Sequence, residues 1–128
     1  MTEEQIALAR RAVACKGFRW MPGMLTTDDE RMSDEGWPDY EVMDFGASSV
    51  IETVEWRDRA KRTSLPDLQD PATLGCLLAL VREAHGPRCY TQACGGYWAV
   101  HNEHTEDVWG DHCPYEAEAL VAALEAAP

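Results

Sequence analysis

The sequence predicts an α+β fold in which a small antiparallel sheet carries about three helices packed on it. Segments with the apolar spacing of helices occur near the start, in the middle and at the end of the chain. Short segments with alternating apolar residues lie between them. Strands and helices do not alternate strictly, as a parallel sheet would require, so antiparallel pairing is favoured. The 128 residues are expected to form a single globular domain, residues 1–128.

The first quarter of the chain is expected to hold one helix and one short strand. Thr2 and Gln5 form a capping box, which starts a helix over about Glu3–Cys15. The segment "FRWMPGML" (18–25) is predicted as a short strand bent at its Pro-Gly pair. Further along, residues 40–56 alternate around a "GASS" turn, which favours a hairpin.

The clearest element is the segment "DPATLGCLLALVREAHG" (70–86). Asp70 is placed to cap a helix, Pro71 suits its first position, and Gly86 suits its end. Apolar residues extend well around this helix, so it is predicted to be the core of the domain and to be covered on more than one side.

Strands are then expected at Arg88–Ala93 and Tyr97–His101, joined by a turn that contains Gly95-Gly96. A weaker strand candidate lies near Asp107–Trp109. Pro114 is predicted to open the last helix, whose apolar residues are spaced on one face.

The composition limits the classes of partner. Eleven Lys and Arg residues against 23 Asp and Glu residues leave a formal net charge of -12 at pH 7. Such a charge repels nucleic-acid phosphates and acidic membranes and attracts basic surfaces, so no direct nucleic-acid binding is expected. No apolar run approaches the roughly 20 residues that cross a bilayer, and the N-terminal residues do not follow a signal-peptide pattern. A cytoplasmic protein without membrane contact is the expectation.

The segment Thr26–Pro38 is rich in Asp, Glu, Ser and Gly, and we expect it to be an exposed loop. Its carboxylates lack the order of a calcium loop, and the functional interpretation is an acidic surface that occupies a basic groove of a partner. The tryptophan in "DEGWPDY" stands among acidic and turn residues and is a candidate anchor for that partner. The candidate binding residues are Asp28, Asp29, Glu30, Asp34, Glu35 and Trp37.

The stretch "QACGG" around Cys94 fits the local pattern of a caspase nucleophile. A nucleophile of that family needs a histidine base about 50 residues upstream, and the one histidine before Cys94 is His85. The pattern is therefore better explained as the turn of a hairpin, and no catalytic residue is predicted.

Thiols and imidazoles gather in the second half of the chain, and they are ligands that zinc prefers. Their spacing is loose and contains no Cys-x-x-Cys pair, so we expect no metal and no other cofactor. The odd number of cysteines, five, favours free thiols. Cys113, expected at the N-cap of the last helix beside His112, is predicted to have a lowered pKa and to be the most reactive thiol. The candidate ligands are Cys89, Cys94, His101, His104, His112 and Cys113.

The segments "LPDLQDPATLGCLLALVREAHG" (65–86) and "EAEALVAALEAAP" (116–128), with the opening "ALARRAVACKGFRWMPGML" (7–25), resemble small accessory proteins of tailed bacteriophages and prophages. The resemblance implies expression in the cytoplasm of a bacterial host and action on a host factor. It implies no catalytic chemistry, because the motifs that carry it are helix and cap signals.

Two classes of function follow. The first is a non-enzymatic acidic binding protein, such as an inhibitor of a host defence system, that acts on a basic surface of a host bacterial protein or sequesters a small ligand. The alternative is a small Cys/His-dependent metal-binding protein or enzyme. The abundant charge and the missing catalytic motifs favour the first.

Overall fold

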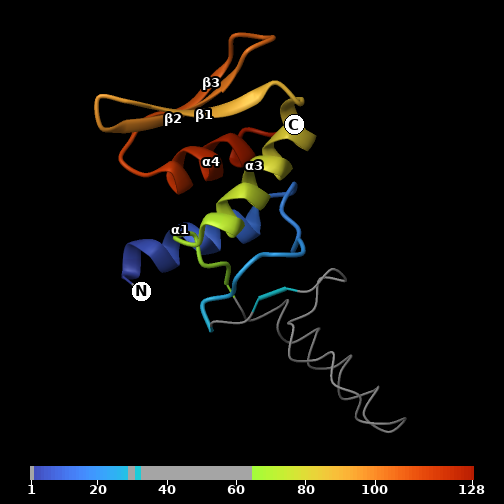
Figure 1. Cartoon of the computed structure of the whole chain (residues 1–128), viewed down its shortest axis with the longest axis vertical. Helices are drawn as coiled ribbons and strands as arrows, with labels where there is room; N and C mark the ends of the chain where they lie inside the picture. The colour runs from blue at the N-terminus through green and yellow to red at the C-terminus, as the bar shows by residue number, and fades with distance from the viewer. Residues whose placement is uncertain (1, 29–30, 33–64) are drawn as a thin grey trace, which may run out of the picture.

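A computed structural model describes residues 2–28, 31–32 and 65–128 of the chain (Figure 1). Within these residues three helices and a three-stranded antiparallel sheet confirm the predicted α+β class. The hairpin predicted over residues 40–56 lies outside the described residues. The elements are α1 (Glu3–Ala14), α3 (Pro71–His85), β1 (Cys89–Cys94), β2 (Tyr97–Asn102), β3 (Val108–Cys113) and α4 (Glu116–Glu125).

The strands are ordered β1-β2-β3, so β2 is central and pairs antiparallel with both neighbours. As Figure 1 shows, α4 and α3 lie on one side of this sheet, and α1 lies on the side of these helices away from it. Helix α4 contacts all three strands as well as α1 and α3. It is therefore the element around which the others are arranged.

Helix α4 needs this cover because its sequence is apolar on nearly every side. Six of its ten residues are buried: Ala117, Ala119, Leu120, Val121, Ala123 and Leu124. The prediction that the helix at 70–86 is the core was therefore only partly right. That helix, α3, begins and ends as predicted, with Asp70 at its N-cap and Gly86 at its C-cap, and contributes Leu77, Leu80 and Val81 to the core.

The β1–β2 hairpin forms as predicted. Gly95 and Gly96 have φ angles of 62° and 85°, the left-handed region that a two-residue turn of this kind requires. Cys94 pairs with Tyr97 directly across the turn. The "QACGG" stretch is thus the end of one strand and its turn.

The strand predicted at residues 18–25 does not form. Only isolated bridges occur there, from Leu25 to Arg31 and from Thr26 to Pro66. The Leu25 N–H donates to Thr73 Oγ1 at 2.9 Å, and its carbonyl accepts from the Asp67 N–H at 2.8 Å. Because these backbone groups bond to separate segments, no continuous ladder forms along residues 18–25.

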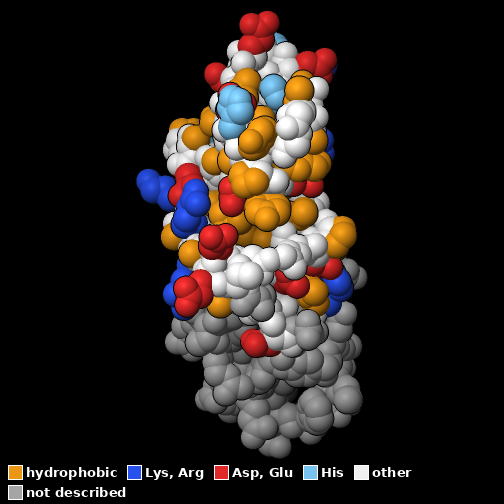
Figure 2. Space-filling model, turned by 90° about the vertical axis from the view of Figure 1, so that its left-hand side faces the viewer, with side chains coloured by type: hydrophobic (Ala, Val, Ile, Leu, Met, Phe, Trp, Pro, Cys, Tyr) orange, Lys and Arg blue, Asp and Glu red, His pale blue; other side chains and the backbone are white. Residues whose placement is uncertain are grey.

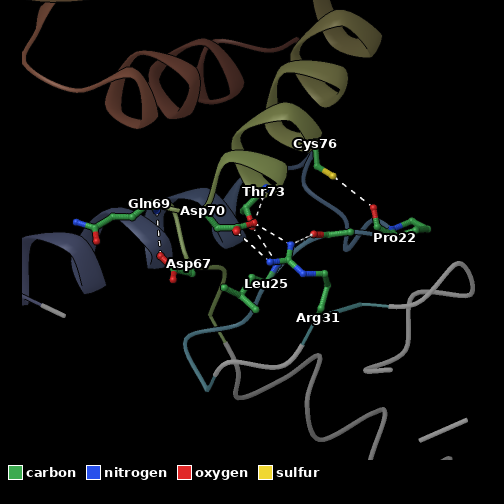
Figure 3. Close-up of polar contacts among 9 residues, drawn as sticks. Pro22, Leu25, Arg31, Asp67, Gln69, Asp70, Thr73 and Cys76 are labelled. Carbon is green, nitrogen blue, oxygen red and sulfur yellow. Dashed lines mark hydrogen bonds and ion pairs between the residues drawn. The ribbon is translucent and has the colours of Figure 1, made fainter. Parts of the chain in front are cut away.

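An ion pair at the start of α3 holds this irregular segment in place (Figure 3). The Asp70 carboxylate accepts two hydrogen bonds of 3.0 Å from the guanidinium of Arg31, one at each oxygen. Its Oδ2 also accepts from the backbone N–H and the hydroxyl of Thr73. One side chain therefore caps the helix and anchors the loop. The Arg31 guanidinium further donates to the carbonyl of Gly23 at 2.7 Å.

The closest approach between sheet and helix occurs at Gly110 of β3. A Cβ atom there would stand 2.6 Å from the Cα of Ala119 on α4, and Gly110 has a φ of 66°.

We expect Gly110→Ala to destabilise the protein by about 1–3 kcal/mol or more, because both overpacking and backbone strain oppose it. Urea denaturation followed by circular dichroism measures this change.

Gly75→Ala is the matched control. Gly75 is exposed within α3, and an added Cβ would have no atom of the described residues within 4 Å. Alanine there should raise stability by about 0.5–1 kcal/mol, since it is the better helix former. Equal effects of the two substitutions would contradict the Gly110–Ala119 contact.

The Asp70 cluster predicts a pH dependence. The hydrogen bonds from Arg31, and after them those from Thr73, hold the pKa of Asp70 below its ordinary value against the effect of burial. Because the folded-state pKa is the lower one, this stabilisation is present above the ordinary aspartate pKa of about 3.9 and is lost as pH falls through the folded-state pKa. Asp70→Asn keeps a capping oxygen but removes the charge, so it should cost about 1–3 kcal/mol at pH 7 and less in acid.

Glu83→Gln is the control for this measurement. Glu83 pairs with Arg19 at the exposed surface, and that pairing also lowers the pKa of Glu83. Exposed pairs contribute little to stability, so this variant should follow the wild type from pH 7 to pH 3. Denaturant titrations across that range compare the three proteins, and identical pH profiles for Asp70→Asn and wild type would contradict the assigned role of Asp70.

Candidate functional site

The structure describes one of the six predicted binding residues. Asp28 is exposed, and its backbone N–H donates to Thr26 Oγ1 at 3.3 Å. The other five candidates lie outside the described residues: Asp29, Glu30, Asp34, Glu35 and Trp37. Their role as a binding surface stays a prediction.

A pocket of about 380 Å³ lies between the starts of α1 and α4 and the segment that leads into α3. Its apolar lining comes from Leu8 of α1, Leu74 of α3 and Leu68. Leu68 is itself buried, whereas the two other leucines are partly exposed. The amides of Gln5 and Gln69 add polar groups to the wall. This volume lies within the usual range of ligand pockets.

Three glutamates belong to the same lining. Glu4 comes from the first turn of α1, and Glu116 and Glu118 come from the first turn of α4. Within the part of the chain that the structure describes, none of the three forms an ion pair. Glu116 is tied to the sheet by a hydrogen bond, in which the Thr91 hydroxyl donates to Glu116 Oε1 at 2.9 Å.

The position of these carboxylates has a local explanation. A helix N-terminus carries roughly half a positive charge, so acidic residues are favoured in the first turn. The N-termini of α1 and α4 together offset roughly one negative charge, while the pocket lining carries three carboxylates. The lining therefore keeps a net negative charge.

Tyr115 forms one wall of the pocket and is the N-cap residue of α4. Its side chain makes no capping hydrogen bond, and 65% of the residue is exposed. The aromatic ring is thus a large solvent-accessible surface beside the carboxylates. The pocket as a whole can bind a group that is cationic at one end and apolar along its stem.

The Cys and His side chains of the second half do not come together. Among the described residues no group of three or more His, Cys, Asp or Glu side chains could hold a metal ion. His85 stacks on Trp109, and His101 stacks on Tyr90, with ring centroids 4.1 Å and 5.4 Å apart. Both rings are thus held by stacking, and the His85 Nε2 also donates to the Ala123 carbonyl at 2.7 Å. The six candidate ligands, all described, are Cys89, Cys94, His101, His104, His112 and Cys113.

The prediction for Cys113 was wrong. The third strand, β3, extends through Cys113, so the N-cap of α4 is Tyr115, two residues later. Burial raises the pKa of the Cys113 thiol, and the charge of Glu118 acts in the same direction. Cys113 thus lies at the end of a strand that packs against α4, and not at the helix N-terminus that would lower its pKa.

The outer face of the sheet is a second exposed surface. Tyr90 and Tyr97 are 39% and 49% exposed, and Val108 is 46% exposed. Figure 2 shows histidine side chains among hydrophobic ones at this end of the molecule, and acidic side chains interspersed with hydrophobic ones below it. The face therefore offers aromatic area to solvent.

Comparisons with protein-family models, with curated proteins and with solved structures find no match for this chain. The described residues contain no helix with the length and apolar character needed to span a membrane. The site is therefore interpreted from its own geometry.

Sequence reasoning missed the pocket, although part of its signal was present. The acidic first turns of α1 and α4 can be found from the sequence, since carboxylates follow each helix start. Their convergence with Leu68 and Leu74 depends on how three distant segments pack, and no local pattern indicates it.

The thiols should differ in reactivity. All five cysteines are free; Cys94 is exposed, and burial raises the pKa of the other four. We expect iodoacetamide at pH 8 to modify Cys94 first in the folded protein, because access and thiolate content control the rate. Peptide mass spectrometry over time measures the order. Faster modification of Cys113 would restore the reactivity that the sequence suggested.

Proposed function

We propose that this chain is a non-enzymatic acidic binding protein that acts on a basic surface of a host bacterial protein. The observation that carries the proposal is the pocket at the starts of α1 and α4, whose lining contains Glu4, Glu116 and Glu118 together with three leucines. A partner with Lys or Arg side chains would gain both apolar contact and charge attraction there.

The charge of the whole chain supports the same function. A net charge of -12 on 128 residues creates a long-range negative field, which speeds the encounter with a basic partner. Asp28 and the acidic residues that follow it would add to this field. The carboxylates would thus guide association, and the pocket would supply contacts that persist in the complex.

The resemblance to phage accessory proteins gives the proposal its biological setting. The protein would act in the cytoplasm of the bacterial host, and inhibition of a host defence system is the form of action that we propose. A defence protein that handles nucleic acid needs a basic groove for phosphates, and an acidic protein can occupy such a groove.

The salt dependence of partner capture tests this proposal. Host proteins captured by the immobilised chain should elute as NaCl rises, because screening shortens the reach of exposed charges to about 8 Å near physiological ionic strength. A second test replaces five acidic residues by Ser or Asn: Asp28, Asp29, Glu30, Asp34 and Glu35. This variant should associate more slowly without a lower melting temperature, because charges at the edge of an interface act mainly on the association rate. Surface plasmon resonance with the captured partner measures that rate.

Cys94→Ala is the control for the same measurement. It removes an exposed thiol and leaves the charge unchanged, so association should stay at the wild-type rate. If Cys94→Ala lost binding or activity while the variant with five acidic residues replaced kept both, the result would contradict the binding function and favour thiol chemistry.

A further inference from the structure

We propose that the pocket between α1, α3 and α4 receives a single arginine side chain of the partner protein. This inference rests on the proposed function and names the chemistry of one contact within it. The observations that carry it are a cavity of about 380 Å³, the apolar character of its leucines, the sign of its charge and an exposed aromatic wall.

The leucines fit the stem of the side chain. Leu8, Leu68 and Leu74 come from three separate segments and present hydrocarbon to the same cavity. The three methylene groups of arginine bury favourably against such a surface while the charged end stays near the rim. An acidic side chain would place a negative charge among carboxylates, so the pocket discriminates by charge as well as by shape.

The carboxylates fit the guanidinium. Glu116 and Glu118 lie in the first turn of α4, and Glu4 lies across the pocket in α1. A guanidinium has five N–H donors in one plane and can bond two carboxylates from different directions. The single ammonium of lysine is a compact point charge and meets such a divided set of acceptors less well.

Tyr115 adds a reason for arginine in place of lysine. Its ring lines the pocket, is largely exposed and is not needed for helix capping. A guanidinium stacks on an aromatic face through both cation–π attraction and planar contact. The same ring beside three carboxylates therefore favours a flat cation.

Peptide binding to the full chain tests the inference. The probes are three peptides, acetyl-Gly-Ser-Gly-X-Gly-Ser-Gly-amide, with arginine, lysine or citrulline at X. Binding is followed by NMR through the backbone amides of Gln5, Leu74 and Ala117, which belong to the pocket lining. The arginine peptide should shift these amides and bind more tightly than the lysine peptide. Citrulline, which is nearly the same shape but neutral, should weaken binding by about tenfold or more, since its hydrogen bonds are no longer charge-assisted.

Isosteric variants locate the contact. The double variant Glu116→Gln, Glu118→Gln keeps side-chain shape, and the amide introduced at position 116 would retain an oxygen that accepts from Thr91, so the fold should persist. It should weaken the arginine peptide by about tenfold or more. The matched control, Glu103→Gln with Glu106→Gln, removes the same charge from the turn between β2 and β3 and should leave the affinity within about twofold, because these exposed residues act on the pocket only through screened charge. Tyr115→Leu should reduce the preference for arginine over lysine.

Equal binding of the citrulline and arginine peptides, or equal weakening by the two double variants, would overturn the inference. The comparison of the citrulline and arginine peptides uses the wild-type protein, so it tests the inference even if a variant folds poorly. Salt-sensitive capture of a host protein, combined with no shift of the pocket amides, would refute the arginine pocket and leave the proposed function standing. Pocket binding of the arginine peptide without salt-sensitive capture would refute the proposed function alone.

Discussion

The burial of α4 between the sheet and the other helices is the constraint on which the described fold depends. A helix with six buried residues among ten cannot lie on a surface, so elements must cover it on opposite sides. The sheet covers one side at close range because Gly110 and Ala119 have almost no side chain at their contact. Helix α1 and helix α3 cover the rest. The position of the pocket follows, since it is formed where the starts of α4 and α1 meet.

The second constraint is the fixed start of α3. Asp70 combines the roles of helix cap and ion-pair partner of Arg31, so the start of α3 and Arg31 are held together. Leu68 and Gln69, which line the pocket, immediately precede this anchor. The Asp70 side chain is only 12% exposed, so its charge is less screened than that of a surface carboxylate. This anchor holds Leu68 and Gln69 at the pocket that they line together with residues of α1.

The sequence predicted what is decided locally. The capping box at Thr2, the Asp70-Pro71 start and the Gly95-Gly96 turn each depend on a few neighbouring residues, and each is confirmed. Errors arose where distant contacts decide. Residues 18–25 looked like a strand, but their backbone bonds to Thr73 and the segment near Asp67; Cys113 looked like a cap, but strand pairing with Trp98 extends β3. The pocket likewise depends on contacts between distant segments, so the sequence did not predict it.

The carboxylates of the pocket link stability to binding. Each one is favoured by the helix N-terminus beside it, by about 0.3–1 kcal/mol when exposed. The packing of the first turns of α1 and α4 places Glu4, Glu116 and Glu118 in the lining of one pocket, and none of the three forms an ion pair among the described residues. Arg11 of α1 bonds to Glu125 at the other end of α4, and its charge also attracts that of Glu118. A bound cation would therefore add a favourable interaction with these carboxylates, and the packing of α1 against α4 prepares the site before any partner arrives.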